Sequence, residues 1–520
     1  MQLATIDLIV IGIYSMMIIG LAQWVSREKE GHEKTAKDYF LAGKALPWWA
    51  IGASLIAANI SAEQIIGMSG SGFVIGLGIA SYEWMAAITL IIVGKYFLPI
   101  FLKQGIYTMP QYLEQRYDHS VRMVMAVFWL GLYIFVNLTA ILWLGALAMN
   151  TIAGIDMIYG VIILGALATA YSLYGGLKAV ALTDIIQVVL LVLGGMIVTW
   201  LALDQISGGA GAWTGFTELM AKAPEKFDMI LSSDNPEYMN LPGISVLVGG
   251  MWIMNISYWG CNQYIIQRAL AAESTREAQK GIIMAAGLKI VMPIFVVLPG
   301  IAAFVLSPDL SAPDQAYPEM MKLVPVGIKG LVFAALIAAI LSSLGSMMNS
   351  ISTIFTMDIY RHFKPNTDDV KLVKIGRIVA LSSIIIAMIT AKPLLGQFDQ
   401  AFQFIQEFTG FFTPGIVVLF ILGLFWKRTT AKAALAAALG SFIMSWGFKV
   451  IWPALPFMDR VGIVFIACTA LAVVISLMSK QKEHVEIVDI KEIDFSTSKS
   501  FNMATIATVL ILIAFYWTWW

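Results

Sequence analysis

The sequence predicts an all-α, polytopic membrane protein with about 14 transmembrane helices. Of its 520 residues, 59% are hydrophobic and only 13% are charged, whereas soluble domains carry about 25% charged residues. The second observation is a series of apolar runs, each close to the roughly 20 residues that a helix needs to cross a bilayer. Too few charges remain to cover a globular surface, which excludes a soluble enzyme. The 33 basic and 33 acidic residues balance, so the net charge indicates no nucleic-acid partner.

Fourteen apolar runs follow one another along the chain, and each is interpreted as one span of the lipid bilayer. They cover residues 4–24, 46–73, 77–105, 119–150, 156–172, 176–205, 244–272, 276–307, 326–357, 369–391, 396–425, 431–455, 459–479 and 502–520.

The distribution of basic residues predicts the direction of the spans. Of the 33 Lys and Arg residues, 24 lie in or beside the connections after odd-numbered spans, and only six lie in those after even-numbered spans. Basic loops stay on the cytoplasmic side of a membrane. We therefore expect a multi-pass protein of the cell membrane with both termini outside.

The order of the spans predicts five segments. Spans 2–6 and 7–11 form two sets of five, and an odd number of spans gives the second set the opposite orientation. The first span of each set carries a polar interruption, which indicates inverted repeats with a site at the membrane midplane. The predicted segments are an N-terminal helix with a basic loop (1–45), repeat one (46–205), an external loop (206–243), repeat two (244–425), and three C-terminal helices with a charged linker (426–520).

Polar residues inside the second span mark a candidate site, because a charged side chain at the bilayer centre costs roughly 2.5–3.5 kcal/mol. Asn59, Glu63 and Gln64 are followed by four glycines between residues 67 and 76. This pattern predicts a helix that unwinds at mid-depth, where its freed carbonyls could bind a small cation. A glycine-rich packing face is the alternative.

Two further spans carry groups that suit a polyol or a sugar. Glu83 in the third span can accept two hydroxyl hydrogen bonds at once, and a structural ion pair with Lys289 is the alternative. In the seventh span, Asn255 and its neighbours supply amides that both donate and accept, and Tyr258 offers a ring to the C–H face of a sugar.

Hydroxyl groups form a polar stripe along the ninth span, between residues 342 and 353. Hydroxyl and carbonyl oxygens suit Na⁺ better than softer metals, although serines in membrane helices more often serve helix packing. The eleventh span carries Gln406 and Glu407 and then Pro414, which predicts another kinked polar helix.

Six motifs occur in order along the chain: DYFLAGK (38–44), SYEW (81–84), YGGLKA (174–179), TDIIQ (183–187), NQYIIQR (262–268) and LFWKR (424–428). With them the chain resembles the sodium/solute symporter family, most of all its sodium–galactose and sodium–glucose type members. The resemblance covers most of the chain. It implies a LeuT-type core of two inverted five-helix repeats, with one extra helix before it and three after. It also implies sodium-driven uptake of a hexose, galactose or glucose, by alternating access.

The resemblance also implies roles for individual positions. The sugar would be held by Gln64, Glu83, Asn255, Lys289 and Gln406. Tyr258 would stack on the sugar as the inner gate, with Asn137 bracing it. The outer side would be closed by Met68, Tyr82 and Phe402. The co-transported sodium ion would bind the carbonyls of Ala57, Ile60 and Ala339 and the hydroxyls of Ser342 and Ser343, and Asp184 would lie on its exit path.

Position 86 departs from the galactose-type pattern, which has serine where this chain has Ala86. One hydrogen bond contributes about 0.5–1.5 kcal/mol net, so glucose or another hexose stays open. Three further functions also stay open: a symporter of the same family for another solute such as inositol or proline, a membrane sensor that binds sugar, and an intramembrane enzyme. An anionic solute would need an arginine at mid-depth, and we find none. An intramembrane enzyme would need paired catalytic groups, and neither Asp184 nor Asp358 has an evident partner.

Overall fold

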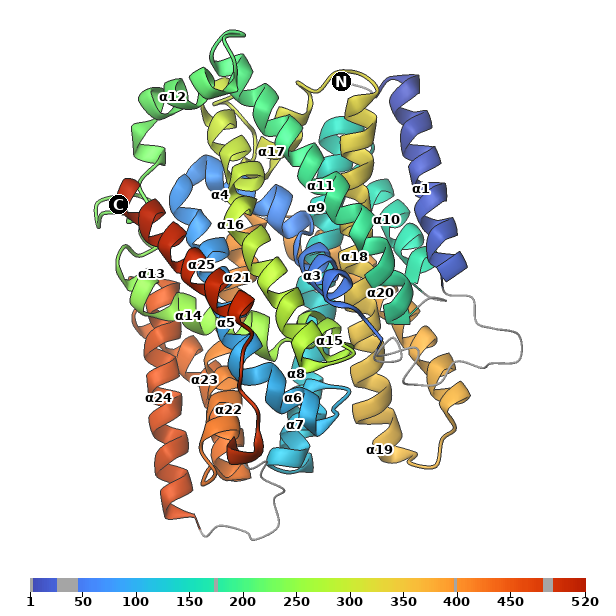
Figure 1. Ribbon diagram of the computed structural model, residues 1–520, viewed down its shortest axis with the longest axis vertical. Coiled ribbons are helices and arrows are strands. Elements are labelled where there is room, and N and C mark those ends of the chain that lie inside the picture. The colour runs from blue at the N-terminus through green and yellow to red at the C-terminus, as the bar shows by residue number, and fades with distance from the viewer. Residues whose placement is uncertain (1–2, 26–44, 173–175, 397–399, 480–489) are drawn as a thin grey trace.

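Figure 1 shows the computed structural model of the protein, which describes residues 3–25, 45–172, 176–396, 400–479 and 490–520. Within these ranges the regular structure is helical, and extended backbone pairs only in an isolated bridge between Leu46 and Ala272. The predicted all-α class is confirmed. The motif DYFLAGK, part of YGGLKA and most of the charged C-terminal linker lie outside the described residues.

Each of the fourteen apolar runs contains helical structure. The first six hold α1 (Thr5–Val25); α3 (Trp48–Asn59) with η2 (Glu63–Met68) and α4 (Ser69–Val74); α5 (Ser81–Ile92), η4 (Val93–Phe97) and α6 (Leu98–Gln104); α8 (His119–Leu132), η5 (Tyr133–Leu138) and α9 (Thr139–Ala153); α10 (Met157–Ser172); and α11 (Gly176–Ile206). The next five hold α13 (Ser245–Val248), α14 (Gly250–Ile256), η7 (Ser257–Cys261) and α15 (Gln263–Leu270); α16 (Thr275–Leu306); α18 (Ile328–Ile354), η9 (Phe355–Tyr360) and α19 (Arg361–Phe363); α20 (Asp369–Leu395); and α21 (Ala401–Gly410) with α22 (Thr413–Phe425). The last three hold α23 (Ala431–Ile451), α24 (Phe457–Met478) and α25 (Lys499–Thr518).

Shorter helices connect these elements: η3 (Leu77–Ala80), α7 (Met109–Arg116), α12 (Ala212–Lys222), η6 (Pro224–Lys226), η8 (Pro313–Gln315), α17 (Ala316–Met321) and η10 (Ile490–Glu492). Among the described residues, nine helices are long and apolar enough to cross a membrane, or eleven if each of two bent pairs is one span.

The second apolar run is broken, as its polar residues predict. α3 ends because the backbone leaves the helical region at Ile60 (φ −74°, ψ 79°). The N–H of Ser61 then donates to the Asn59 carbonyl at 2.8 Å, so it no longer reaches the carbonyl of Ala57, its partner in a continuous helix. The chain resumes as the π-helical η2, and the two halves meet at 60°.

The glycines of this run do not form the break, which corrects one part of the prediction. The helix stops before Gly67, and the glycines serve close packing further on. A Cβ on Gly70 would lie 2.5 Å from the carboxylate oxygen Oδ1 of Asp314, and one on Gly72 would lie 2.9 Å from the Val297 carbonyl oxygen. The polar residues therefore mark the predicted break, and the glycines form the packing face that was the alternative interpretation.

The seventh and eleventh apolar runs are also interrupted. In the seventh, the π-helical η7 ends at Cys261, and Asn262 is extended (φ −88°, ψ 120°) before α15 begins. In the eleventh, α21 and α22 are bent by 50°. Pro414 lies in the first turn of α22, where its missing N–H costs nothing. Polar backbone is thus available where these helices break.

The LFWKR motif follows the C-terminal end of α22, where a buried arginine supplies the hydrogen bonds. Arg116 donates from Nε to the Gly423 carbonyl at 2.8 Å, from Nη2 to Trp426 at 2.9 Å and from Nη1 to Thr429 at 3.2 Å. The last carbonyls of a helix have no partner within it. Arg116 therefore joins α7 to the end of α22.

Two sets of contacts place the chain ends. In the loop 206–243, the N–H of Met229 donates to the Trp519 carbonyl at 2.8 Å. Asp7 accepts the N–H groups of Gly327 and Gly330, both at 2.8 Å, where α18 begins. Figure 1 shows the N-terminus, the C-terminus and α12 in the upper half of the view. Both described ends therefore lie beside loops that the sequence predicts to be external.

The loop 206–243 also covers the end of α4. Lys226 donates from Nζ to the Val74 carbonyl at 2.5 Å, and burial lowers the pKa of this ammonium below its usual value. Gly76 has φ +94°, and a Cβ there would overlap the Lys226 carbonyl oxygen. Glycine is required at this position both by its backbone conformation and by the loop packed against it.

Candidate functional site

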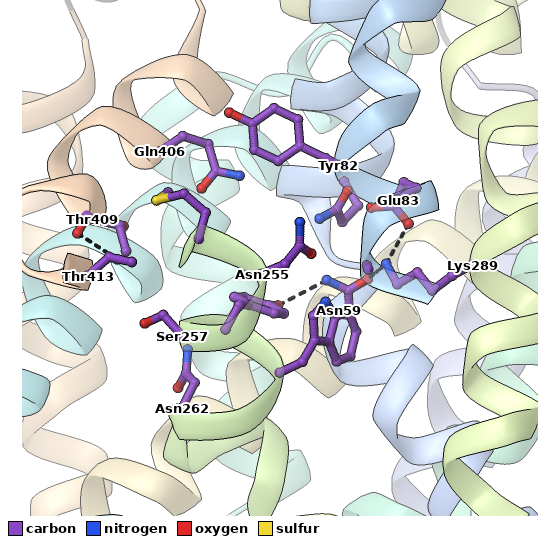
Figure 2. A pocket seen from close by; sticks show the side chains of 15 residues that line it. Asn59, Tyr82, Glu83, Asn255, Ser257, Asn262, Lys289, Gln406, Thr409 and Thr413 are labelled. Atoms are coloured by element: carbon purple, nitrogen blue, oxygen red, sulfur yellow. Dashed lines mark hydrogen bonds and ion pairs between the residues drawn. The ribbon is translucent and has the colours of Figure 1, made fainter. Parts of the chain in front are cut away.

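A polar cavity lies among the broken helices (Figure 2). Its walls come from α3 and η2, α5, α14 and η7, α16, α21 and α22. It is lined by Asn59, Gln64, Tyr82, Glu83, Ala86, Met254, Asn255, Ser257, Tyr258, Trp259, Asn262, Lys289, Gln406, Thr409 and Thr413. All six side chains to which the resemblance assigns sugar contacts belong to this set.

A buried ion pair forms one side of the cavity. Lys289 on α16 donates from Nζ to the Glu83 carboxylate on α5 at 2.5 Å, and the two side chains are 0% and 2% exposed. Lys289 also donates to the Asn59 side-chain oxygen, and its ammonium lies 5.0 Å from the centre of the Trp259 ring. The structural pair that the sequence left open is thus present, in the wall of the cavity.

Tyr258 connects the end of α3 to the seventh run. Its hydroxyl accepts from the Asn59 amide nitrogen at 3.0 Å and shares a short hydrogen bond with the Tyr264 hydroxyl. Among the described contacts, no hydrogen bond joins Asn137 to this ring. Asn137 lies on the π-helical η5 in the fourth run, where it is near Glu63 of the broken second run.

Amide groups face the cavity from two other sides (Figure 2). Asn255 on α14 donates its amide N–H to the Met251 carbonyl at 3.1 Å, so the side-chain oxygen of Asn255 takes no part in this hydrogen bond. Gln64 Oε1 is buried and has no hydrogen-bond partner within the described part of the chain. A buried polar atom without a partner is costly, so a bound hydroxyl would satisfy it.

Tyr82 in the cavity wall packs against Phe402 on α21. The rings of Tyr82 and Phe402 meet edge to face, with centroids 5.2 Å apart. Both residues and Met68 are buried. A Cβ on Gly67 would lie 3.1 Å from Cβ of Phe402, so the outer half of the second run packs directly on α21.

The predicted sodium ligands lie where α3 meets α18. Ser343 donates its hydroxyl to the Ala58 carbonyl at 3.1 Å, and its oxygen lies 3.5 Å from the Ala57 carbonyl. Ala57 and Ile60 flank the break, and Ala339 lies one turn before Ser343 on α18. This end of α3 therefore presents backbone oxygens to a hydroxyl on α18.

Ser342 points to a neighbouring polar cluster. It donates to one oxygen of Asp184 on α11, and Ser54 on α3 donates to the other at 2.6 Å. Arg268 on α15 donates from Nε to the Ser54 hydroxyl at 2.8 Å and from Nη2 to the Ser346 hydroxyl. All five side chains are buried, so this cluster joins four helices beside the predicted sodium ligands.

One of two expectations about charged residues is wrong. The sequence predicts no arginine at mid-depth, which stays a prediction, but hydropathy did not indicate that Arg268 near the end of the seventh run is fully buried. The sequence shows no evident partner for Asp184 or Asp358, yet Asp184 accepts from Ser54 and Asp358 pairs with Arg122 at 2.8 Å. In each case the partner comes from a helix distant in sequence.

Several residues in the cavity wall had no assigned role. Asn59, already noted as polar, lines the cavity and contacts both Lys289 and Tyr258, and Ser257, Thr409 and Thr413 line the side opposite α16. Thr409 lies one turn after Gln406 on α21. The helical spacing from Gln406 could have identified Thr409 once the inward face of α21 was known.

The sodium:solute symporter family matches residues 39–440, which is more than half of the chain. The chain belongs to this family. As a member, the protein is a transporter rather than an enzyme, and sodium is the coupled ion.

Several relatives of this symporter have names that state what they carry. The sodium/glucose cotransporter of Vibrio parahaemolyticus is 51% identical over 542 residues, covering 100% of this chain and 99% of that protein. The human and mouse proteins named sodium/myo-inositol cotransporter 2 are 32% identical over 457 residues, covering 82% of this chain and 67% of each relative.

Two solved structures share the fold of this symporter. A substrate-bound, outward-open Na⁺-coupled sialic acid symporter has a TM-score of 0.80 at 24% identity and covers 92% of this chain and 100% of its own. The nucleobase-cation-symport-1 family transporter Mhp1 has a TM-score of 0.54 at 13% identity, covering 91% and 99%. These likenesses concern the fold alone.

Proposed function

We propose that this symporter carries a hexose, galactose or glucose, into the cell together with sodium by alternating access. One observation carries the proposal: a polar cavity, lined by Glu83, Lys289 and four further expected sugar ligands, lies against a helix whose break frees backbone carbonyls beside Ser343. The name of the Vibrio parahaemolyticus relative, a sodium/glucose cotransporter, supports it.

The cavity chemistry suits a neutral polyhydroxy solute. The Glu83 carboxylate accepts hydrogen bonds, the Lys289 ammonium donates them, and the amides do both. A sugar can therefore pair its hydroxyls with every wall, while the Tyr258 ring covers its C–H face.

Sodium would be held by the carbonyls of Ala57, Ile60 and Ala339 and by the hydroxyls of Ser342 and Ser343. An ion at this position draws the end of α3 against α18. Asn59 follows within two residues of Ala57 and contacts Lys289 and Tyr258. The position of Asn59, and with it the shape of the sugar site, thus depends on the sodium site.

The sodium gradient gives alternating access its driving force, and the sodium site couples that gradient to the sugar. Sodium binding favours the state in which the sugar site is formed, since a ligand shifts an equilibrium only by its different affinity for the two states. The membrane potential adds about 2.3 kcal/mol per charge per 100 mV. After inward opening, sodium would leave past Asp184, Tyr258 would move aside, and Met68, Tyr82 and Phe402 would keep the outer side closed.

The proposed layout has fourteen spans in the cell membrane and both termini outside. Residues 46–205 and 244–425 form the two inverted repeats, preceded by residues 1–45, separated by the external loop 206–243 and followed by residues 426–520. The support is the positive-inside distribution, interruptions in the first run of each set, and the chain ends that meet the predicted external loops.

The preferred hexose depends on position 86. Ala86 lines the cavity on the same helix as Glu83 and supplies no hydroxyl. A second candidate is another neutral solute such as inositol, which the names of the 32% identical human and mouse relatives favour. A sensor that binds sugar without moving it is the third.

Uptake into proteoliposomes tests the proposal. Radiolabelled galactose and glucose should accumulate with an inward sodium gradient and not with potassium, and epimeric sugars should compete according to fit. Ala86→Ser should improve the competition by galactose by about two- to tenfold, the value of one hydrogen bond. Accumulation indifferent to the cation would contradict sodium symport, saturable binding without flux would favour a sensor, and competition by inositol alone would favour the second candidate.

A further inference from the structure

Glu407 lies beside the cavity residue Gln406 on α21, but it faces helices outside the proposed repeats. Its Oε1 accepts from Lys449 Nζ on α23 at 2.8 Å and from Arg460 Nη2 on α24 at 3.1 Å. The Arg460 side chain is only 4% exposed, against 33% for Glu407 and 47% for Lys449. Arg460 is therefore the buried partner of this cluster.

The end of α21 rests on the same turn of α24. The Arg460 guanidinium lies 4.8 Å from the centre of the Phe411 ring. A Cβ on Gly410 would lie 3.1 Å from Cγ2 of Val461. Because α21 and α22 are bent by 50°, α22 does not fix the direction of α21 by continuity, and these contacts supply a separate support.

The first turn of α24 also supports α14, which carries Asn255. A Cβ on Gly250 would overlap the Met458 carbonyl oxygen, so the two backbones touch. Figure 1 shows α13 and α14 beside the upper end of α24. One helical turn thus contacts the elements that bring Gln406 and Asn255 to the cavity.

We propose that Arg460 is a positioning residue of the sugar site, which holds α21 through Glu407 and Phe411 so that Gln406 and Thr409 reach the cavity. This inference rests on the proposed function. It gives α24, a helix outside the five-plus-five core, a part in sugar affinity. Arg460 itself does not line the cavity, and its described contacts are with Glu407 and Phe411 rather than with the predicted sodium ligands, so sodium affinity should not depend on it.

Uptake kinetics test this. Arg460→Gln and Glu407→Gln should each raise the sugar KM by about fivefold or more with sodium saturating, and the double variant should lose less than the two single losses combined, because both changes break the contact that the two residues share. The sodium half-saturation should stay within about twofold with sugar saturating, and Arg460→Lys should recover most of the affinity. Lys322→Gln is the control, since it removes another basic group that pairs with a glutamate, here Glu319 on α17 at 2.6 Å. An unchanged sugar KM in Arg460→Gln, additive losses in the double variant, or equal shifts for sugar and sodium overturn the proposal.

A second readout needs no sugar and separates this inference from the proposed function. Cys261 and Cys468 are buried, so a cysteine introduced as Thr409→Cys can be labelled selectively with a maleimide. Arg460→Gln should change the labelling rate at this position by about fivefold, whereas Lys322→Gln should not. If the wild type takes up no sugar, the proposed function fails, but the labelling rate still tests whether Arg460 positions α21. Equal labelling rates of Thr409→Cys with and without Arg460→Gln overturn the inference.

Discussion

At the residue scale, the main question is whether the Glu83–Lys289 pair binds the sugar or only stabilises the fold. Taking two charges out of water costs several kcal/mol per ion, and a buried pair often stabilises a protein no more than an apolar pair of the same size. Here the pair lines a polar cavity and shares Asn59 with the end of α3. Its place in the cavity wall supports a role in binding hydroxyl groups.

Glu83→Ala should abolish sugar uptake and also destabilise the protein by about 3–5 kcal/mol, because it leaves the Lys289 ammonium buried without its carboxylate. Combining Glu83→Ala with Lys289→Met should restore much of the thermal stability in detergent but not the uptake. Thermal unfolding and proteoliposome uptake, measured on the same preparations, separate the two effects. Near wild-type uptake in the double variant would assign the pair to structure alone.

Ser343→Ala should raise the sodium concentration for half-maximal uptake by about tenfold or more, since a hydrogen-bonding group that faces a charge contributes about 1.5–3 kcal/mol. The sugar KM should be unchanged once sodium saturates. Ser352→Ala is the matched control, because Ser352 is buried on the same helix away from the α3 break. A sodium dependence equal to that of the wild type would return Ser343 to helix packing.

At the scale of elements, α4, the helix after the break in the second run, can pack closely against its neighbours only because it carries glycine. A Cβ on Gly70 would lie 2.9 Å from the backbone N and Cα of Asp314 as well as 2.5 Å from its carboxylate. Asp314 also accepts the N–H of Ala401, the first residue of α21, at 3.0 Å. The loop before α18 therefore joins the outer half of the second run to α21.

Gly70→Ala should lower the thermal stability in detergent by the equivalent of about 1–3 kcal/mol, the usual cost of overpacking. Gly131→Ala on α8 is the control. A Cβ there meets nothing within 4 Å, and alanine favours a helix over glycine by about 1 kcal/mol. Equal effects of the two substitutions would show that the approach to Asp314 is not tight.

Sequence patterns predicted which elements break better than where side chains meet. The polar residues of the second, seventh and eleventh runs predicted interruptions, because polar groups inside a bilayer are costly unless they have partners or face a cavity. The prediction treated the glycines as part of the signal for the break, but Gly70 packs against a loop more than 200 residues away. Periodicity carries no information on such a neighbour.

The site shows the same limit. Residue types pointed to Glu83 and to amides, and the family resemblance supplied the six positions that line one cavity. Hydropathy did not predict the burial of Arg268, because a long basic side chain near the end of an apolar run can ordinarily reach water. Its partners Ser54 and Ser346 come from α3 and α18, and only the tertiary fold brings them together.

At the scale of the whole molecule, both chain ends should be accessible from outside the cell. The buried state of Cys261 and Cys468 means that an introduced cysteine can be labelled selectively. Trp520→Cys should react with a membrane-impermeant maleimide on intact cells, and Lys364→Cys in the exposed connection after α19 should react only after the membrane is opened. The reverse pattern would contradict the proposed orientation.

In the proposed function, sodium and sugar bind to one broken helix, so their binding should be linked in both directions. Calorimetric titration of the purified symporter with galactose or glucose, in sodium and in potassium, measures this directly. The account predicts that sodium raises sugar affinity by about tenfold and that sugar raises sodium affinity by the same factor, as linkage requires. Equal sugar affinity in the two cations would contradict it.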